Sequence, residues 1–418
     1  GSGGSGGPQS AARAAHWGFV ARQHLVFGQL IDERLPASAR PDSPMAQPGY
    51  YFECAASAAI RQRAAFDECK ALSPRKGLAL EDGPCIGQVS RQGAADGPPS
   101  PVSDEDFLAH LHARQATIEH SRRVIDLLQM AQNNLGATGA RFAQRQQCLM
   151  AEEYMRMGEV QMAQGLLLSA AATYRREGWD SLLAVASTKL RKCAQQLRDV
   201  QDHLAHSFEV CSLEHAFDFD ERCAIHQSAL ALIQGQVFSG EESVPRGFHF
   251  QVGEGSPLTS CFSCAVGFLV GPSGASPTPG SPLKVVVAIQ SRGPLPIPVR
   301  ALEAEFSDPA CDRRVEFTAG ATGGVGEGGV AGGLHLLSLG GEGGVAPQSL
   351  VMVPSEWKRC VLEICPEQLG QLQCNRVRLF VGEASQFEFE FHSLALPGSA
   401  VAEVTGVGIE GPFGSKEK

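Results

Sequence analysis

One segment constrains the fold of this chain more than any other. Residues 150–179, MAEEYMRMGEVQMAQGLLLSAAATYRREGW, have the pattern of a tetratricopeptide-type helical hairpin. The pattern requires an aromatic residue on the first helix, a glycine in the turn, and small residues at fixed offsets on the second helix. These positions hold Tyr154, Gly158, Ala163, Leu167 and Ala170. Because one hairpin cannot bury its apolar face alone, the segment predicts neighbouring hairpins and favours a binding scaffold over a reaction centre.

The hairpin residues have separate physical roles. Gly158 allows the backbone to reverse between the helices. Ala163 and Ala170 lie about two turns apart on one face, where small side chains let helices approach closely. Gly178 suits the position after a helix C-terminus. Trp179 is then expected to fill the gap to the next helix, and the alternative is an exposed anchor for a partner.

The composition indicates a globular protein with more than one domain. At 418 residues the chain is too long for one ordinary core, so two domains are expected. Its formal net charge of −10 argues against nucleic acid or an anionic membrane as the main partner. No run of about 18 apolar residues occurs, so no direct membrane span is expected. The opening GSGGSGG is interpreted as an expression linker or the start of an excised fragment, with residues 1–13 as linker or disordered.

The first half of the chain is predicted to be helical. The recurrence of Trp17, Val20, His24, Phe27 and Ile31 indicates a core-facing stripe on a helix over Ala14–Leu35. Further helices are expected over Tyr50–Leu72, from the N-cap Ser103 to Leu135 before Gly136 and Gly139, over Ser181–Leu204, and in one or two pieces between residues 205 and 236. Residues 73–101 are Gly-, Pro- and Ser-rich and predict a loop insertion. Together these segments predict an α-solenoid over 14–238, with about eight to ten helices.

After Ser239 the helical periodicity gives way to short strands. Phe387, Phe389 and Phe391 alternate with polar residues, which indicates a strand with one buried face. Nine strands are predicted: Ser260–Val270, Leu283–Gln290, Val299–Phe306, Arg314–Thr318, Leu334–Leu339, Ser349–Val353, Trp357–Ile364, Asn375–Val381 and Phe387–Leu394. They favour an immunoglobulin-like antiparallel β-sandwich over 239–396. Residues 320–344 predict a flexible Gly-rich loop, and 397–418 a linker tail.

No arrangement typical of an enzyme, a cofactor site or a metal site is found. The GGVGEGG segment lacks the strand, helix and Lys-Ser/Thr of a phosphate-binding loop. Cys261 and Cys264 form an isolated C-x-x-C inside a predicted strand, which indicates structural thiols, as do Cys360 and Cys365. A thiol nucleophile at Cys148 or Cys223 would need a positioned histidine base. The helical histidines are instead expected to be solvated or satisfied surface residues: His110, His112, His120, His203, His206, His215 and His226.

Glu152 and Glu153 form an acidic pair on the first helix of the hairpin. A solvated helix face is the expected explanation, and contact with a basic partner is the alternative.

The segment from Tyr174 to Leu183, YRREGWDSLL, resembles the signature of the foie gras domain found in a large subunit of the transport protein particle (TRAPP) tethering complex. The segment from Trp17 to Glu33, with Phe27 and Gly28, is similar to the family's N-terminal helix. Pro48-Gly49-Tyr50-Tyr51 with Arg61-Gln62-Arg63 resembles its next helix. The similarity covers about residues 16–204 and is weaker beyond, where it rests on Pro298–Leu302 and the Val353-Pro354 turn. The insertions at 73–101 and 320–344, and Asp180, depart from the family pattern.

The resemblance implies a non-enzymatic scaffold subunit without cofactors. Its partners would be other TRAPP subunits and, through the complex, a Rab GTPase whose nucleotide exchange is carried by small core subunits. It further implies roles in ER-to-Golgi transport and autophagy, in the cytoplasm and peripherally at Golgi membranes. The alternative is a coat or adaptor accessory protein whose β-sandwich captures short peptides, which an exposed sheet edge and a peptide-sized groove would favour.

Overall fold

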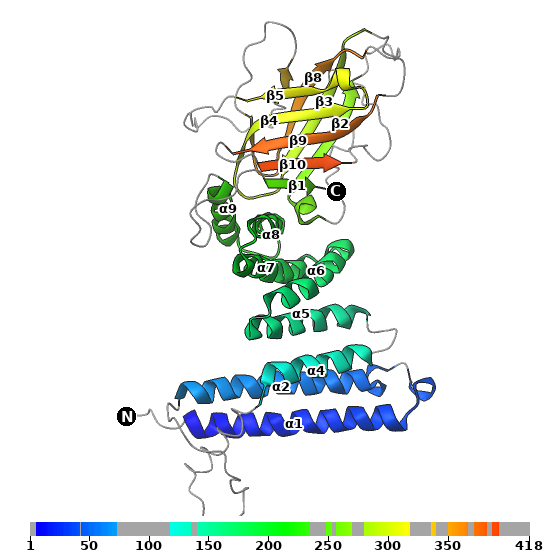
Figure 1. Cartoon of the computed structure of the whole chain (residues 1–418), viewed down its shortest axis with the longest axis vertical. Coiled ribbons are helices and arrows are strands. Elements are labelled where there is room, and N and C mark those ends of the chain that lie inside the picture. Colours follow the sequence, from blue (N-terminus) through cyan, green and yellow to red (C-terminus); the bar gives the residue numbers. More distant parts are fainter. Residues whose placement is uncertain are drawn as a thin grey trace, which may run out of the picture. The chain divides into compact units, whose positions relative to one another are not determined.

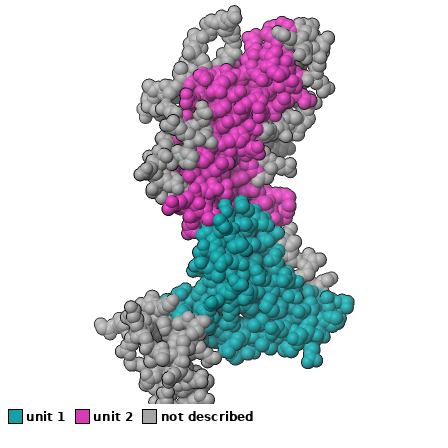
Figure 2. Space-filling view, in the orientation of Figure 1, with its two compact units in different colours: residues 1–170 teal, residues 171–418 magenta. Residues whose placement is uncertain are grey.

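The structure is a computed structural model of the whole chain. It describes residues 6–41, 43–72, 118–134, 140–233, 248–252, 256–269, 280–317, 336–339, 350–366, 372–382 and 387–392. The chain divides into two compact units, Gly1–Ala170 and Ala171–Lys418 (Figure 2). The insertion at 73–101, the tail at 397–418, Ser103, His110, His112, Gly136 and Gly139 lie outside the described residues.

In the first unit, helices that follow one another in sequence also pack against one another. Helix α1 (Gly6–Arg34) packs on α2 (Pro48–Leu72), with two 3₁₀ turns between them, η1 (Ala37–Ala39) and η2 (Pro44–Ala46). Helix α2 packs on α4 (His120–Asn133), and α4 on α5 (Ala140–Met157) (Figure 1). Helix α6 (Val160–Glu177) begins in this unit. The predicted start of α1 at Ala14 was too late, because the alanine-rich run before it and Pro8 in the first turn both favour helix.

Helices α1 and α2 approach closely through small residues. A Cβ atom added to Gly28 would lie 2.6 Å from Cε1 of the buried Phe52, and one added to Gly18 would lie 2.8 Å from Nε2 of Gln62. Ala14 and Ala21 are buried on the same face of α1. The predicted stripe therefore lies at the edge of the core: Trp17 and Val20 are half-buried and pack against it, His24 and Ile31 are half-buried, and Phe27 is 56% exposed.

The core of the first unit combines alanines of α2 with the branched side chains of α4. Ala55 and Ala59 of α2 are fully buried beside Val124 and Leu128 of α4. At the edge of this core, Glu153 of α5 is buried and paired with Arg63 of α2. The prediction that Glu153 belongs to a solvated face was wrong, because an arginine of another helix neutralises it. Glu152 is half-buried.

Three consecutive helices end in the same backbone turn. Gly158, Gly178 and Arg198 have φ angles of 82°, 71° and 59°, all in the left-handed region. The amide of the following residue donates to the carbonyl five positions back, as in Glu159 N to Tyr154 O and Trp179 N to Tyr174 O, both 2.9 Å. The two glycine turns confirm the predicted turn positions.

The third turn corrects a prediction. Residues 181–204 do not form one helix but two, α7 (Asp180–Leu197) and α8 (Val200–Ser212). Arg198 adopts the left-handed conformation without being glycine, and the Asp199 side chain caps α8 by accepting from Asp202 N at 2.9 Å. Helix α9 (Phe219–Ile233) follows.

The remainder of the second unit consists of two β-sheets. In the larger sheet, the order is β1 (Phe248–Val252), β10 (Phe387–His392), β9 (Cys374–Val381), β4 (Ile297–Phe306) and β5 (Arg313–Glu316), and β7 (Leu350–Met352) also pairs with β4. In the other, the order is β2 (Phe262–Leu269), β3 (Leu283–Ser291), β8 (Trp357–Ile364) and β6 (Leu336–Leu339).

All nine predicted strands are present, and their boundaries differ by a few residues. Strand β1 was missed, and the expectation of antiparallel pairing was wrong at two places. β1 runs parallel to β10, and β6 runs parallel to β8. Strand β6 lies within the segment predicted to be a flexible loop.

The helices and the two sheets of the second unit share one core. Phe208 of α8 is fully buried and contacts Phe262 of β2 and Phe389 of β10, with ring centroids 5.6 Å and 6.0 Å apart. The same cluster continues into α9 through Ile233. The change of composition after Ser239 is thus a change of secondary structure within one packed unit. The proposed division at 238/239 stays a prediction.

Charged and polar side chains are buried among the helices of the second unit. Glu209 of α8 is fully buried and accepts from Arg175 Nε and Ser187 Oγ, each at 2.7 Å, while His206 Nδ1 lies 3.3 Å away. Burial alone would raise the pKa of Glu209, but the hydrogen bonds from His206 and Arg175 outweigh it and lower the pKa.

Three histidines expected at the surface are buried instead: His203, His206 and His226. Nδ1 of His226 accepts from Leu295 N at 3.1 Å, and its ring packs edge-on against Phe208. Burial lowers the pKa of His203 and of His226 to about 4, assisted at His226 by the charge of Arg222. These rings are therefore neutral core residues. His215 is exposed, and His120 is half-buried and stacked on Phe66.

The close approach of α1 and α2 predicts the effect of one added methyl group. Gly28→Ala should lower the free energy of unfolding by about 1–3 kcal/mol, because the Phe52 ring must shift inside a packed interface. The control is Gly165→Ala in α6, where an added Cβ meets nothing within 4 Å. That change should be neutral or stabilising by up to about 1 kcal/mol. Urea unfolding of both variants measures the difference, and equal effects would contradict the packing argument.

The buried histidines predict acid sensitivity. Since their pKa is lowered on folding, the unfolded chain binds protons that the folded chain does not. Stability should therefore be fully present above about pH 6.5 and fall as pH decreases towards 4, by up to about 3 kcal/mol for each of His203 and His226. His226→Asn retains an acceptor near the Leu295 amide and should reduce this slope between pH 6.5 and 4.5. The same change at exposed His215 should leave the slope unchanged, as urea unfolding across this pH range will measure.

Candidate functional site: a groove between α1, α2 and α5

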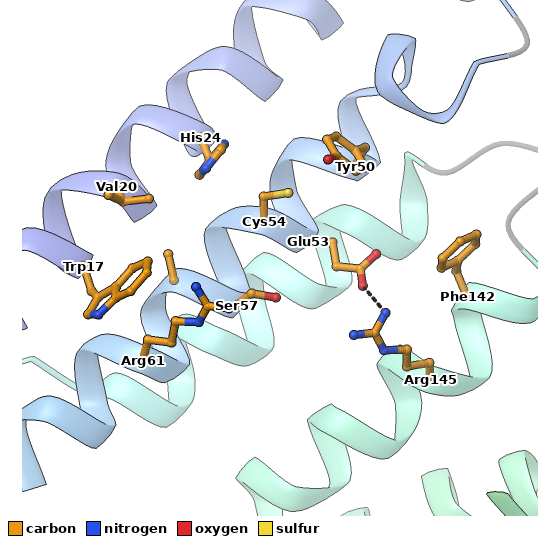
Figure 3. A pocket seen from close by; sticks show the side chains of 11 residues that line it. Trp17, Val20, His24, Tyr50, Glu53, Cys54, Ser57, Arg61, Phe142 and Arg145 are labelled. Carbon is orange, nitrogen blue, oxygen red and sulfur yellow. Dashed lines mark ion pairs between the residues drawn. The ribbon is translucent and has the colours of Figure 1, made fainter.

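A groove of about 350 Å³ opens in the first unit, lined by side chains of three helices (Figure 3). Helix α2 supplies positions that recur every three or four residues and so lie on one face. The complete lining is Trp17, Val20 and His24 of α1, Tyr50, Glu53, Cys54, Ser57, Ala58 and Arg61 of α2, and Phe142 and Arg145 of α5. The groove exists because the backbones of α1 and α2 approach through small residues, which displaces the larger side chains of α1 to its flank.

The aromatic side chains of the groove are held in place by their neighbours. The guanidinium of Arg61 lies over the ring of Trp17, with Cζ 4.7 Å from the centroid, a cation–π geometry. Tyr50 meets Tyr51 edge-on, with ring centroids 5.3 Å apart. Tyr51 in turn contacts the exposed ring of Phe27 at 5.6 Å, so the aromatic surface continues from the groove onto α1.

The charged side chains of the groove are unequally exposed. Arg145 lies 3.1 Å from Glu53, and its side chain is 62% exposed whereas that of Glu53 is 14% exposed (Figure 3). Arg61 is exposed, and among the described residues no carboxylate lies within ion-pair distance of it. The outward-facing charge of the groove is therefore positive.

The hydroxyl of Tyr50 and the thiol of Cys54 are close enough to affect each other's ionisation. Burial raises the pKa of Cys54, and the proximity of Cys54 raises the pKa of Tyr50. Both groups are therefore un-ionised at neutral pH and add no negative charge. The groove presents aromatic, polar and cationic groups, which suits binding and offers no activated nucleophile.

The residues of the predicted sequence signature have different roles in the structure. Trp17 and Tyr50 line the groove, and Gly28 contacts Phe52. Ala163, Leu167, Ala170 and Tyr174 are buried, Tyr154 is half-buried, and Gly158 and Gly178 form turns. Trp179 is half-buried and stacks on Tyr174, with ring centroids 5.9 Å apart.

Several groove residues were not predicted from the sequence. Phe142 and Arg145 carried no recognisable signal, because they precede the hairpin segment at 150–179 and belong to no motif. Glu53 and Cys54 follow the aromatic triplet of α2, and their spacing from Arg61 places all three on one helix face. That periodicity could have indicated the face, but not its opposing helix.

A second cluster of charged residues lies on the outer face of the larger sheet. Ligand atoms of His249, Glu388 and Glu390 lie within 4.8 Å of one another, a grouping that could hold a metal ion. Arg378 Nη1 lies 3.5 Å from Glu388, and Arg376 Nη1 lies 3.6 Å from Glu390. On β4, Arg378 also pairs with Glu303, and Arg376 also pairs with Glu305. The cluster is thus part of a cross-strand ladder of opposite charges, whose arginines already supply positive charge to both carboxylates.

The thiols of the sheets are structural. Burial raises the pKa of Cys261 and Cys264 well above the ordinary value and that of Cys360 to about 12. Cys365 is exposed. Cys148 and Cys223 are half-buried on α5 and α9. Cys223 lies near the thiol of Cys211, and burial raises the pKa of Cys211 to about 12. No helix in the described part of the chain combines the length and apolar content needed to cross a bilayer.

These environments predict the pattern of alkylation. When the native chain is treated with iodoacetamide at pH 7.5, Cys365 should be modified, while Cys261 and Cys360 should react only after denaturation, because burial keeps them protonated and inaccessible. Peptide mass spectrometry of native and unfolded samples compares the sites directly. Rapid native modification of Cys261 would show that its strand opens or that its thiol is activated.

Comparison with known proteins identifies the helical region. The model of the Foie gras liver health family 1 matches residues 4–213. No curated protein matches. Among solved structures, alkylpurine DNA glycosylase AlkC of Pseudomonas fluorescens, bound to DNA with an abasic site analogue, is 11% identical and covers 92% of this chain and 98% of its own. Its TM-score of 0.15 carries no argument about fold or activity. Because the family match spans half of the 418 residues, this chain belongs to the Foie gras liver health family 1.

Proposed function

We propose that this chain is a non-enzymatic scaffold subunit of a TRAPP-type vesicle-tethering complex, acting in ER-to-Golgi transport and autophagy. Its direct partners are other subunits of the complex, and it meets a Rab GTPase through them. The chain acts in the cytoplasm, peripherally at Golgi and ER–Golgi intermediate membranes. It requires no cofactor for this role.

A single observation carries the proposal: within the family-matched region, α1 exposes a row of large apolar side chains. Phe19, Val26 and Leu30 are 53%, 48% and 45% exposed and share one helix face, opposite the small residues that pack on α2. We call these three residues the α1 stripe. Large apolar side chains exposed on one outer helix face are typical of a protein interface. The link to the TRAPP complex comes from the sequence resemblance.

The architecture that we propose for this role is an α-solenoid of tetratricopeptide-like hairpins followed by an immunoglobulin-like sandwich. The repeated left-handed turns at Gly158, Gly178 and Arg198 support regular helix reversal. The two sheets share one apolar core, as the layers of a sandwich do. Both features suit a rigid scaffold.

The alternative function, a coat or adaptor accessory protein, is favoured by one feature of the smaller sheet. Strand β2 pairs with β3 only, as far as the described residues extend, so it is an edge strand. A peptide could add to such an edge through backbone hydrogen bonds. The proposed scaffold role is preferred because the family match covers the helices and not this edge.

The α1 stripe provides the test. Phe19→Ser with Val26→Ser should abolish co-purification of TRAPP subunits from cell extract, while the melting temperature changes little because both side chains face outward. The matched control is Leu168→Ser with Val185→Ser, which removes exposed apolar side chains from α6 and α7 and should leave the partners bound. Recovery of TRAPP subunits by the α1 stripe variant would contradict the interface, and recovery of coat or cargo peptides alone by the wild type would favour the adaptor function.

A further inference from the structure

The groove between α1, α2 and α5 has the dimensions of a helix-binding site. Its α2 wall runs from Tyr50 to Arg61. At a rise of 1.5 Å per residue this wall is about 16 Å long, or roughly three helical turns. Helix α1 forms one side through Trp17 and Val20, and α5 forms the other through Phe142 (Figure 3).

The lining provides positions for apolar side chains of a ligand. Phe142 is 42% exposed, and Trp17, Val20 and Tyr50 are half-buried, so all four retain surface that another apolar group could cover. These residues come from α1, α2 and α5, so apolar surface is present on each wall of the groove. An amphipathic helix presents its apolar residues at intervals of three and four positions, which matches a groove of this length.

The charge of the groove selects the ligand further. Arg61 and Arg145 face outward, while Glu53 lies deeper and is paired with Arg145. The groove is thus locally basic in a chain whose formal net charge is −10. A partner with acidic residues beside its apolar stripe gains charge complementarity here, whereas a basic helix meets two arginines.

We propose that this groove binds an acidic amphipathic helix of a partner protein. The apolar stripe of that helix packs between Trp17, Tyr50 and Phe142, and its carboxylates pair with Arg61 and Arg145. The inference rests on the proposed scaffold function and names the chemistry of one partner contact. It uses a surface distinct from the α1 stripe, so the two can fail separately.

The first experiment selects ligands from a displayed library of random 16-residue peptides, with the full chain as bait. Peptides enriched by the wild type should carry apolar residues at helical spacing together with Asp or Glu, and their affinity should fall as salt increases. Enrichment of peptides without acidic residues, or of none at all, overturns the proposal.

Variants then localise the binding. Arg61→Glu should weaken a selected peptide at least tenfold, and substituting Lys for the acidic residues of that peptide should restore binding to this variant. Arg156→Glu, which changes an exposed arginine of α5 outside the groove, should have no effect. Unchanged binding to Arg61→Glu overturns the proposal.

A second copy of the chain is the other possible occupant, and it is distinguished by mass. If the wild type self-associates in sedimentation equilibrium and Arg61→Glu is monomeric, a second copy occupies the groove and the proposal is overturned. A monomeric wild type whose selected peptide reduces the quenching of its tryptophan fluorescence by iodide supports it, provided that Arg61→Glu loses the protection. Loss of TRAPP subunits by the α1 stripe variant, with peptide binding intact, would separate the two surfaces.

Discussion

The close approach of α1 and α2 is the constraint on which the first unit depends. Gly28 faces the ring of Phe52, and Gly18 faces the side chain of Gln62, with no space for a Cβ atom at either glycine. Because the interface is filled by small residues, the large side chains of α1 lie on its flanks. One flank forms the groove wall with Trp17 and Val20, and the opposite face carries the α1 stripe. Both candidate binding surfaces therefore depend on the packing of small residues of α1 against α2. If α1 buried its large side chains against α2, the groove wall and the α1 stripe would both be covered.

The second unit depends on a different arrangement, in which a helix is part of a β core. Phe208 contacts both Phe262 and Phe389, and His226 of α9 packs edge-on against Phe208. A Cβ added to Gly293 would lie 2.6 Å from the His226 ring, so the loop after β3 fits closely against it. The buried Glu209 is tolerated because Arg175, Ser187 and His206 surround its carboxylate. Helices α8 and α9 therefore contact the sheet region through apolar packing at Phe208 and through the hydrogen bond from Leu295 N to His226.

Local patterns predicted local structure well, and the failures share a physical cause. The glycine turns, most of the helices and all nine proposed strands follow from periodicity and turn chemistry, which act over a few residues. The helix predicted from Ser103 to Leu135 was wrong in its extent, because α4 begins only at His120. The turn at Arg198 was missed because an arginine rarely adopts the left-handed conformation, although Asp199 three residues before Asp202 is an N-cap signal. Strand β1 was missed because its partner β10 is more than one hundred residues away. The burial of His203, His206 and His226 also depends on distant partners.

The groove shows why a site of this kind is hardest to foresee. Its residues come from three helices, and no local pattern connects them: Trp17 belongs to the predicted stripe of α1, Arg61 to α2, and Phe142 to a part of α5 without a motif. The whole-chain charge was also misleading about it. A net charge of −10 argues against polyanions as partners only if charge is spread evenly, yet Arg61 and Arg145 gather where aromatic side chains are exposed. Local charge and local apolar area, rather than their averages, determine what a surface binds. An acidic chain can therefore contain a basic, aromatic groove, and an acidic amphipathic helix is the ligand that satisfies both properties at once.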